Sequence, residues 1–187
     1  MWLGALTVPI VGLLAGMWLM SFGSRQNKSS DRIDIGSKLM LSSPDISYAM
    51  TTAQNNLAQI RLGKLAAAKA GDSDVRSFGK QMVDDYVKAS DQLRVIAQQQ
   101  NMTLPDVVSV KDQVTIDQLA KLSGSSFDKV YLDRMLKDQE AELKSSRKQA
   151  ATGKNTSIRG FASQMVATLR DHLDRIRLIQ SKVKVSR

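Results

Sequence analysis

The stretch LSGSSFDKVYLDRMLKDQEAEL, Leu122 to Leu143, decides the fold. It opens on a Ser-Gly turn and continues as a regular mixture of polar and apolar residues. One set of side chains recurs every four residues, which places it close to one face of an α-helix: Phe127, Tyr131, Met135, Gln139 and Leu143. Serines 125 and 126 are suitable N-cap residues. The stretch therefore predicts a long amphipathic helix over Ser126–Ala151, which ends at the polar run TGKNTS.

The same periodicity predicts three further long helices. They cover Ile46–Ala70, a segment from Asp72 or Ser73 to Gln100, and Ile158–Val183, while a short helix over Lys111–Leu122 lies in the connection between the second and third long helices. Helices of about 25 residues are near 38 Å long and pack side by side as a bundle. No segment shows a competing strand pattern. The sequence therefore predicts an all-α domain over residues 46–187, a four-helix bundle with a short extra helix in its crossover.

The N-terminus differs in composition from this domain. Trp2 to Phe22 is a run of 21 residues without a charge, which is long enough to span a bilayer. Residues 1–23 are therefore predicted to be a membrane anchor or a cleaved secretory signal, for which SFG at Ser21–Gly23 is a suitable cleavage site. Residues 24–45 are predicted to be a linker that is flexible or lies along a partner protein. Its short apolar word, Leu39, Met40 and Leu41, is the candidate contact with that partner.

Composition excludes several kinds of chemistry. The chain has no Cys and one His, so disulfides, thiolate nucleophiles and Cys-ligated metal centres are ruled out. The net charge is +9, and the segment Lys154–Arg187 alone carries +6. That basic segment is either a solvated helix face or a surface for anionic lipid, phosphates or an acidic partner. Aromatic residues make up 5% of the chain, so no stacking platform for nucleic acid is predicted, and nucleic acid is not an expected partner.

Three of the predicted helices repeat one phrase, an Asp followed by a hydrogen-bonding residue. It is MVDDY at Met82–Tyr86, MLKDQ at 135–139 and LRDHL at Leu169–Leu173. In each case the residue after the Asp falls at a position that faces the predicted core. These residues are Tyr86, Gln139 and His172. The repeat raises the question of whether the interior holds a metal ion.

The segments NNLAQIRLGKLAAAKAGDSDVRSFGKQMVDDY, LSGSSFDKVYLDRMLKDQ and LRDHL resemble the DUF4142 family of bacterial envelope proteins. The resemblance covers about Ser47 to Val183 and implies a ferritin-like fold. The family pattern has a Glu in its first helix and a His after each of the three Asp residues. This chain has Gln59, Tyr86, Gln139 and His172 at those positions, so three of the four potential ligands are replaced. We therefore expect no metal and no cofactor, and instead a neutral hydrogen-bonded layer of these four residues.

These observations favour a non-catalytic accessory or structural subunit on the periplasmic side of the inner membrane. In size and build the chain is similar to the small third subunit of membrane-bound quinoprotein alcohol dehydrogenases, in which other subunits carry pyrroloquinoline quinone and haem. Two alternatives stay open. One is a ferritin-like metal-binding or redox stress protein, and the other is a module that binds a membrane surface or a polyanion through the basic segment.

Overall fold

Five α-helices make up the part of the chain that the computed structural model describes, residues 41–185, with side chains as far as residue 182. The four long helices are α2 (Ser43–Lys69), α3 (Ser73–Gln99), α5 (Gly124–Thr152) and α6 (Thr156–Val185), and the short one is α4 (Val110–Ala120). Each lies within a few residues of its predicted range. The described residues form no strand beyond one isolated bridge between Ala70 and Gly124.

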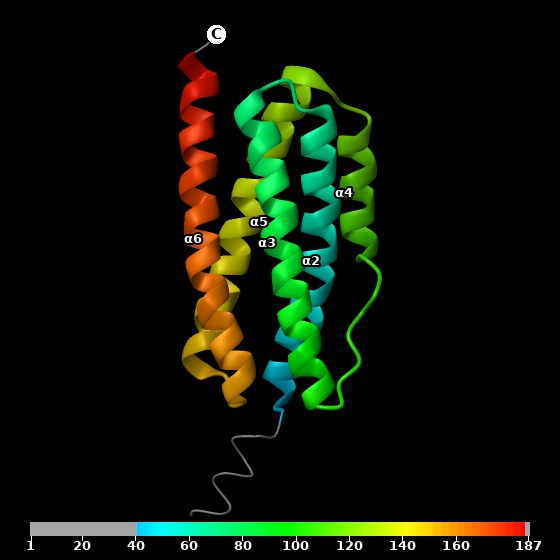
Figure 1. Ribbon diagram of the computed structural model, residues 1–187, viewed down its shortest axis with the longest axis vertical. Helices are drawn as coiled ribbons and strands as arrows, with labels where there is room; N and C mark the ends of the chain where they lie inside the picture. The colour runs from blue at the N-terminus through cyan, green and yellow to red at the C-terminus, as the bar shows by residue number, and fades with distance from the viewer. Residues whose placement is uncertain (1–40, 186–187) are drawn as a thin grey trace, which may run out of the picture.

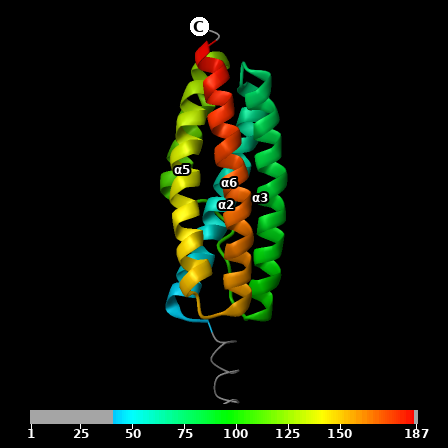
Figure 2. The same cartoon turned by 90° about the vertical axis from the view of Figure 1, so that its left-hand side faces the viewer.

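The long helices form two antiparallel pairs. Helices α2 and α3 pack along their lengths, as do α5 and α6, and contacts of α3 with α6 and of α2 with α5 close the bundle. Figure 2 shows α6 flanked by α5 and α3. The connection from α3 to α5 runs back along the bundle, so that α4 packs against α2 and α5 on its outside (Figure 1). The all-α bundle with a short helix in its crossover, predicted from the sequence, is confirmed.

The first long helix begins earlier than predicted. We expected Ile46, but α2 begins at Ser43, because Ser42 and Asp45 form a capping box and Pro44 suits the first turn of a helix. The last residues of the predicted linker therefore belong to the bundle, and Leu41 packs partly buried against the core. Leu39, Met40, the predicted linker up to residue 40 and the predicted membrane segment 1–23 lie outside the described residues. Among residues 41–185, no helix has the length and apolarity needed to cross a bilayer.

The hydrophobic core runs the length of the bundle and contains large side chains from every long helix. Tyr86, Phe78, Phe127 and Tyr131 are among the largest that are fully buried. Two glycines let α2 and α3 approach closely, since a Cβ on Gly79 would lie 2.6 Å from the Cβ of Ala66 and 2.7 Å from the carbonyl oxygen of Gly63. The glycines therefore set the spacing of this helix pair.

Two buried aspartates fasten the turns at opposite ends of the bundle. Asp128, from the opening stretch of α5, accepts hydrogen bonds from the backbone amides of Gly71 (3.0 Å) and Asp72 (2.9 Å) in the α2–α3 turn. At the other end, Asp45 accepts hydrogen bonds from the amides of Lys154 and Asn155, both at 3.2 Å, in the α5–α6 turn. Each helix pair is thus tied to the other through a carboxylate.

Candidate functional site

A chain of hydrogen bonds crosses the interior of the bundle. Tyr86 on α3 donates its hydroxyl hydrogen to Oε2 of Glu142 on α5 (2.8 Å), and Nε2 of Gln139 donates to the Tyr86 oxygen (2.8 Å). The Gln139 carbonyl oxygen lies 3.0 Å from Nδ1 of His172 on α6. The other ring nitrogen of His172 lies 3.0 Å from Oδ2 of Asp85 on α3. We call these five residues the polar chain.

The polar chain joins three of the four residues that we expected to share a layer. Tyr86, Gln139 and His172 are fully buried and contact one another through hydrogen bonds. Gln59 on α2 is also buried, with 4% of its surface exposed, but its Oε1 atom makes no hydrogen bond. It lies beside Glu142 in the lining of a pocket. Gln59 is therefore separate from the polar chain, although its helix packs against the same interior.

Burial sets the protonation of the polar chain. Desolvation raises the pKa of Glu142 to about 7, even though the hydrogen bond from Tyr86 opposes the shift. Desolvation lowers the pKa of His172, and the hydrogen bond with Asp85 opposes that shift. Burial and the nearby Glu142 also raise the pKa of Tyr86 well above its ordinary value. Near neutral pH the interior therefore disfavours both an ionised glutamate and an imidazolium.

The direction of the hydrogen bonds follows from the Gln139 amide. When its nitrogen faces Tyr86, Nδ1 of His172 must donate to its oxygen, and a second proton must lie between Nε2 and Asp85. Reversing the amide also satisfies every contact, with a neutral His172 that donates to Asp85 and a protonated Glu142 that donates to Tyr86. The two arrangements hold the same number of protons, and the pKa directions of His172 and Glu142 favour the second below about pH 7. Each contact within the polar chain therefore has one donor and one acceptor in either arrangement, and Oε1 of Glu142 is the polar-chain atom left without a partner.

These residues do not fit the metal site that a ferritin-like fold implies. Such a site needs several carboxylates and imidazoles that converge on one ion. Here both nitrogens of His172 are engaged in hydrogen bonds, one with the Gln139 amide and one with the Asp85 carboxylate. Of the expected ligand positions on α3 and α5, one holds a phenol and the other an amide. No group of three or more His, Asp or Glu side chains in residues 41–182 is arranged to hold a metal ion. We therefore assign no chemistry at this site to a metal.

The aspartates of the sequence repeat have different partners. Asp85 contacts His172 on the neighbouring helix, whereas Asp138 pairs with Arg134 on its own helix at 2.5 Å, and Asp171 is exposed. Desolvation raises the pKa of Asp138, against the opposing effect of Arg134. Glu142 was missed by the sequence analysis, although it lies three residues beyond Gln139 and so faces the same side of α5.

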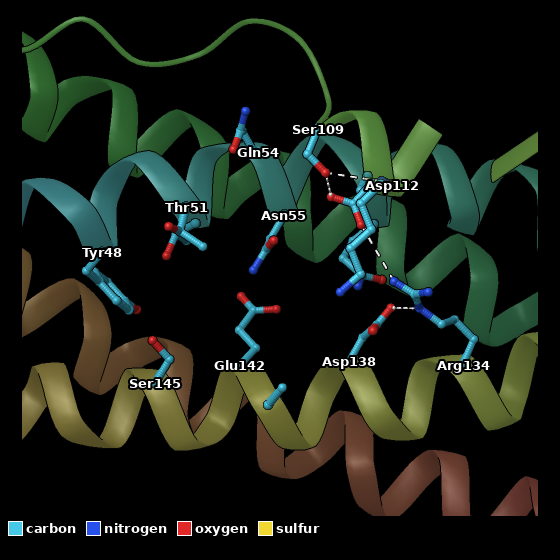
Figure 3. A pocket seen from close by; sticks show the side chains of 15 residues that line it. Tyr48, Thr51, Gln54, Asn55, Ser109, Asp112, Arg134, Asp138, Glu142 and Ser145 are labelled. Atoms are coloured by element: carbon cyan, nitrogen blue, oxygen red, sulfur yellow. Dashed lines mark hydrogen bonds and ion pairs between the residues drawn. The ribbon is translucent and has the colours of Figure 1, made fainter. Parts of the chain in front are cut away.

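A pocket of about 370 Å³ opens beside the polar chain, between α2, the start of α4 and α5. In Figure 3 the Glu142 carboxylate points from α5 toward α2, on the side where Asn55 lies. Oε1 of Glu142, the oxygen that Tyr86 does not contact, makes no hydrogen bond. Arg134 lies farther along the pocket and contacts Asp138 and Asp112, the latter at 3.6 Å. The pocket therefore places one buried, half-satisfied carboxylate beside an ion-pair cluster in which two aspartates share Arg134.

Several cations of the basic segment are engaged within the bundle. Lys182 on α6 pairs with Asp74 on α3 at 2.8 Å. Arg177 lies 3.4 Å from Glu140 on α5 and 3.6 Å from Asp174. These contacts use part of the positive charge of Lys154–Arg187 to hold α6 against its neighbours. The side chains beyond residue 182 lie outside the described part.

Two solved structures share this fold. The crystal structure of a DUF305 fragment from Deinococcus radiodurans matches with a TM-score of 0.68 and 10% identity, covering 76% of this chain and 99% of that one. A dodecameric thioferritin, the bacterioferritin-related protein from Bacteroides fragilis, matches with a TM-score of 0.64 and 12% identity, covering 86% and 96%. At these identities the likeness shows the fold alone. The bundle is thus ferritin-like, as the sequence resemblance implied.

Comparison with curated proteins gives no significant match. The family model described as "Domain of unknown function (DUF4142)" matches residues 33–179, which is most of the chain and includes the whole polar chain. The protein therefore belongs to the DUF4142 family.

Proposed function

We propose that this protein is a non-catalytic accessory subunit of a membrane-associated complex in the bacterial envelope. In this proposal the apolar N-terminus holds the protein at the inner membrane, and the bundle lies on the periplasmic side. The segment before α2 and the outer surface of the bundle contact a partner protein. The chain has no Cys and its single His is buried in the polar chain, so it lacks a thiolate nucleophile and an accessible imidazole base.

The observation that carries the proposal is the closure of the polar chain. A ferritin-like enzyme or metal store uses the centre of its bundle, where side chains from several helices meet a ligand. Here Tyr86, Gln139 and His172 meet one another instead, through contacts of 2.8 to 3.0 Å. Buried side chains that bond to one another in this way fix helix packing, and the proposal assigns the contact with a partner to the outer surface.

An apolar surface on the crossover supports a protein partner. Val107 precedes α4, and Val110 and Val114 lie one turn apart on it, with exposed fractions of 61%, 84% and 51%. We call these three residues the valine surface. Clustered exposed apolar side chains mark interaction sites more often than single ones do. Helix α4, which carries Val110 and Val114, lies on the side of the bundle away from α6 (Figure 1).

The most specific form of the proposal is that the partner is a quinoprotein alcohol dehydrogenase. The size of the chain and its single helical domain suit the small subunit of such a complex, which stabilises or anchors the catalytic subunit. The partner would supply pyrroloquinoline quinone and haem, and this chain would bind neither cofactor.

Co-purification tests the accessory role. The full chain and a variant that lacks residues 24–40 are expressed in their native membranes, and partners are recovered after mild solubilisation. This deletion keeps Ser42, so the capping box of α2 stays intact. We expect the deletion variant to lose the partner, and we expect the partner's steady-state level to fall.

A second variant carries Ser at all three positions of the valine surface, and its control carries Ser at Val87 and Val95, which are exposed on α3.

We expect the valine-surface variant to lose the partner and the α3 control to retain it. Unchanged recovery and unchanged partner level in both the deletion and the valine-surface variant would contradict the accessory role. Catalytic turnover by the isolated, cofactor-free chain would contradict its non-catalytic part. Recovery of a partner without pyrroloquinoline quinone or haem would remove the dehydrogenase assignment while leaving the broader role.

The periplasmic location is tested with a single introduced thiol. The chain has no Cys, so Gln118→Cys on the exposed side of α4 provides the one reactive site. We expect a membrane-impermeant maleimide to label this variant in spheroplasts with an intact inner membrane. Labelling that occurs only after the membrane is broken would contradict the periplasmic location.

A further inference from the structure

Two buried oxygen atoms in the pocket beside the polar chain have no hydrogen-bond donor. They are Oε1 of Glu142, whose residue is 5% exposed, and Oε1 of Gln59, which is 4% exposed. Both residues line the pocket between α2, α4 and α5. A buried acceptor without a donor is unfavourable, and a carboxylate oxygen is more unfavourable than an amide oxygen. A bound molecule that carries hydrogen-bond donors would therefore satisfy both acceptors.

Arg134 and Asp138, the other charged groups on the α5 side of the pocket, already form an ion pair. Arg134 is held by Asp138 at 2.5 Å and Asp112 at 3.6 Å, and it also donates to the Thr115 hydroxyl group at 3.0 Å. These contacts place its guanidinium between Asp138 and Asp112 (Figure 3). Lys111 is exposed at the start of α4 and also lines the pocket. When Glu142 is ionised, it is the buried acid whose charge the pocket leaves without a partner.

The remaining lining suits a small organic molecule. Its groups are hydroxyls, amides and short apolar surfaces, contributed by Thr51, Asn55 and Ser145 together with Tyr48, Ala58 and Ala141. A volume of about 370 Å³ lies within the range of pockets that bind small ligands. It is far larger than a single ion requires. A divalent cation would also need several carboxylate or carbonyl ligands, whereas residues 41–182 contain no cluster of three acids and histidines fit to hold one.

We propose that this pocket binds a small organic cation with a primary ammonium group, with Glu142 as its counter-ion and Gln59 as a second acceptor. An ammonium group carries three N–H donors, which match the two unpartnered oxygens and one neighbouring hydroxyl group. The attached carbon chain would lie along the Tyr48 ring and the two alanines. This inference does not depend on the accessory role, because the lining of the pocket excludes the valine surface.

Binding is linked to protons through Glu142. An ammonium group favours the ionised carboxylate, whereas burial in the free protein favours the neutral acid. The other charged groups facing the pocket are Asp138 and Arg134 on α5 and Asp112 and Lys111 on α4. These four groups line the pocket at both pH values of the test below. Affinity is therefore expected to rise with pH through the neutral range, with release of a proton on binding below pH 7.

The test uses the full chain in detergent and two probes that differ in their donors. n-Butylammonium carries three N–H groups, and tetramethylammonium carries the same charge without any. Binding is measured by calorimetry at pH 6 and pH 8 and by amide chemical shifts. We expect n-butylammonium to bind in the millimolar range or better, to bind at least three-fold more tightly at pH 8, and to shift residues of the pocket. Tetramethylammonium should bind at least ten-fold more weakly.

Three variants locate the site. Glu142→Gln should weaken n-butylammonium binding at least ten-fold, while Glu140→Gln removes the same charge from an exposed position of α5 and should leave it unchanged. Ala141→Leu adds bulk to the pocket lining at an exposed position that is not part of the polar chain, and should also abolish binding. Equal affinity of the Glu142→Gln and wild-type proteins would overturn the proposal. Equal binding of both probes, or chemical-shift changes confined to other surfaces, would also overturn it. Binding of n-butylammonium that does not saturate by 50 mM would overturn it as well and would show that the pocket holds only water.

Discussion

The hydroxyl oxygen of Tyr86 lies 2.8 Å from Oε2 of Glu142, and this hydrogen bond joins the interior of the bundle to the pocket beside it. On one side of it, Gln139 and His172 complete a hydrogen-bonded chain as far as Asp85. On the other side, the second oxygen of Glu142 faces the pocket without a donor. One glutamate thus belongs to the structural network and to the proposed binding site.

Removing the Tyr86 hydroxyl group tests the energetic value of that contact. Tyr86→Phe leaves both Gln139 and Glu142 without the hydroxyl group that each contacts, so we expect a loss of roughly 2 kcal/mol in the free energy of unfolding. Tyr131→Phe is the matched control, because Tyr131 is equally buried but its hydroxyl group has no partner. It should change stability by less than about 0.5 kcal/mol or increase it. Urea unfolding at pH 7 measures both, and equal effects would contradict the network.

The pH dependence of stability provides a second prediction. Burial raises the pKa of Glu142 from 4.5 to about 7 in the folded protein, so the unfolded chain loses this proton at lower pH. Stability contributed by the neutral acid is therefore lost as the pH rises between these values, by roughly 3 kcal/mol in all. Glu142→Gln removes this loss and keeps an acceptor for Tyr86. We expect the variant to match wild type near pH 4 and to exceed it by up to about 3 kcal/mol at pH 8.

The titration of His172 changes stability with pH in the opposite direction. The effect of Glu142 is therefore measured as the difference in stability between wild type and Glu142→Gln. Burial lowers the pKa of His172, so its neutral form contributes stability that is lost as the pH falls below about 6.5. Wild type and Glu142→Gln share this contribution, and it cancels in the comparison. Glu140→Gln controls for charge. A stability difference that does not change between pH 4 and pH 8 would show that Glu142 ionises normally in the folded state.

The helices could be predicted because local signals agreed with packing. Phe127, Tyr131 and Met135 follow helical spacing, and they lie in the core where that spacing placed them. The start of α2 was missed because Pro44 was interpreted as part of a linker, whereas Pro is compatible with the first turn and Ser42 caps Asp45. Periodicity locates a helix face well and its first residue poorly.

The site could be predicted only in part. Tyr86, Gln139 and His172 stand out as polar residues at core positions, and the structure joins them by hydrogen bonds. The partners of the aspartates could not be predicted, because Asp85 reaches another helix and Asp138 its own. Which partner an aspartate contacts depends on the rotation of its helix about the helix axis. The sequence pattern leaves this rotation uncertain by about one residue. Glu142 could have been found from its position one turn beyond Gln139.

The close packing of α2 on α3 gives a third prediction. Gly79→Ala places a Cβ 2.6 Å from that of Ala66 and 2.7 Å from the Gly63 carbonyl oxygen, so the helices must separate. We expect a loss of about 1–3 kcal/mol in stability. Gly160→Ala on α6 meets no atom within 4 Å and should stabilise the protein by roughly 0.5–1 kcal/mol through helix propensity. Thermal and urea unfolding measure both, and destabilisation by Gly160→Ala would contradict the packing described.

The carboxylate that holds the α2–α3 turn gives a fourth prediction. Asp128→Ala leaves the amides of Gly71 and Asp72 without their acceptor, which should cost roughly 1–3 kcal/mol. It should also speed hydrogen exchange at both amides by at least ten-fold. Asp133→Ala on the same helix removes an exposed acid and should change neither quantity much. Slow exchange of the Gly71 amide in Asp128→Ala would show that the turn does not depend on this carboxylate.

The closure of the polar chain is the central claim, and the single histidine of the sequence allows a direct measurement of it. In protein labelled with ¹⁵N-histidine, nuclear magnetic resonance reports the two ring nitrogens of His172 without interference. We predict one set of signals, with hydrogen bonds at both Nδ1 and Nε2, a pKa below the ordinary value of 6.5, and no change when Zn²⁺ or Mn²⁺ is added. Metal-dependent shifts or broadening of either nitrogen, saturating at one ion per chain, would contradict the account.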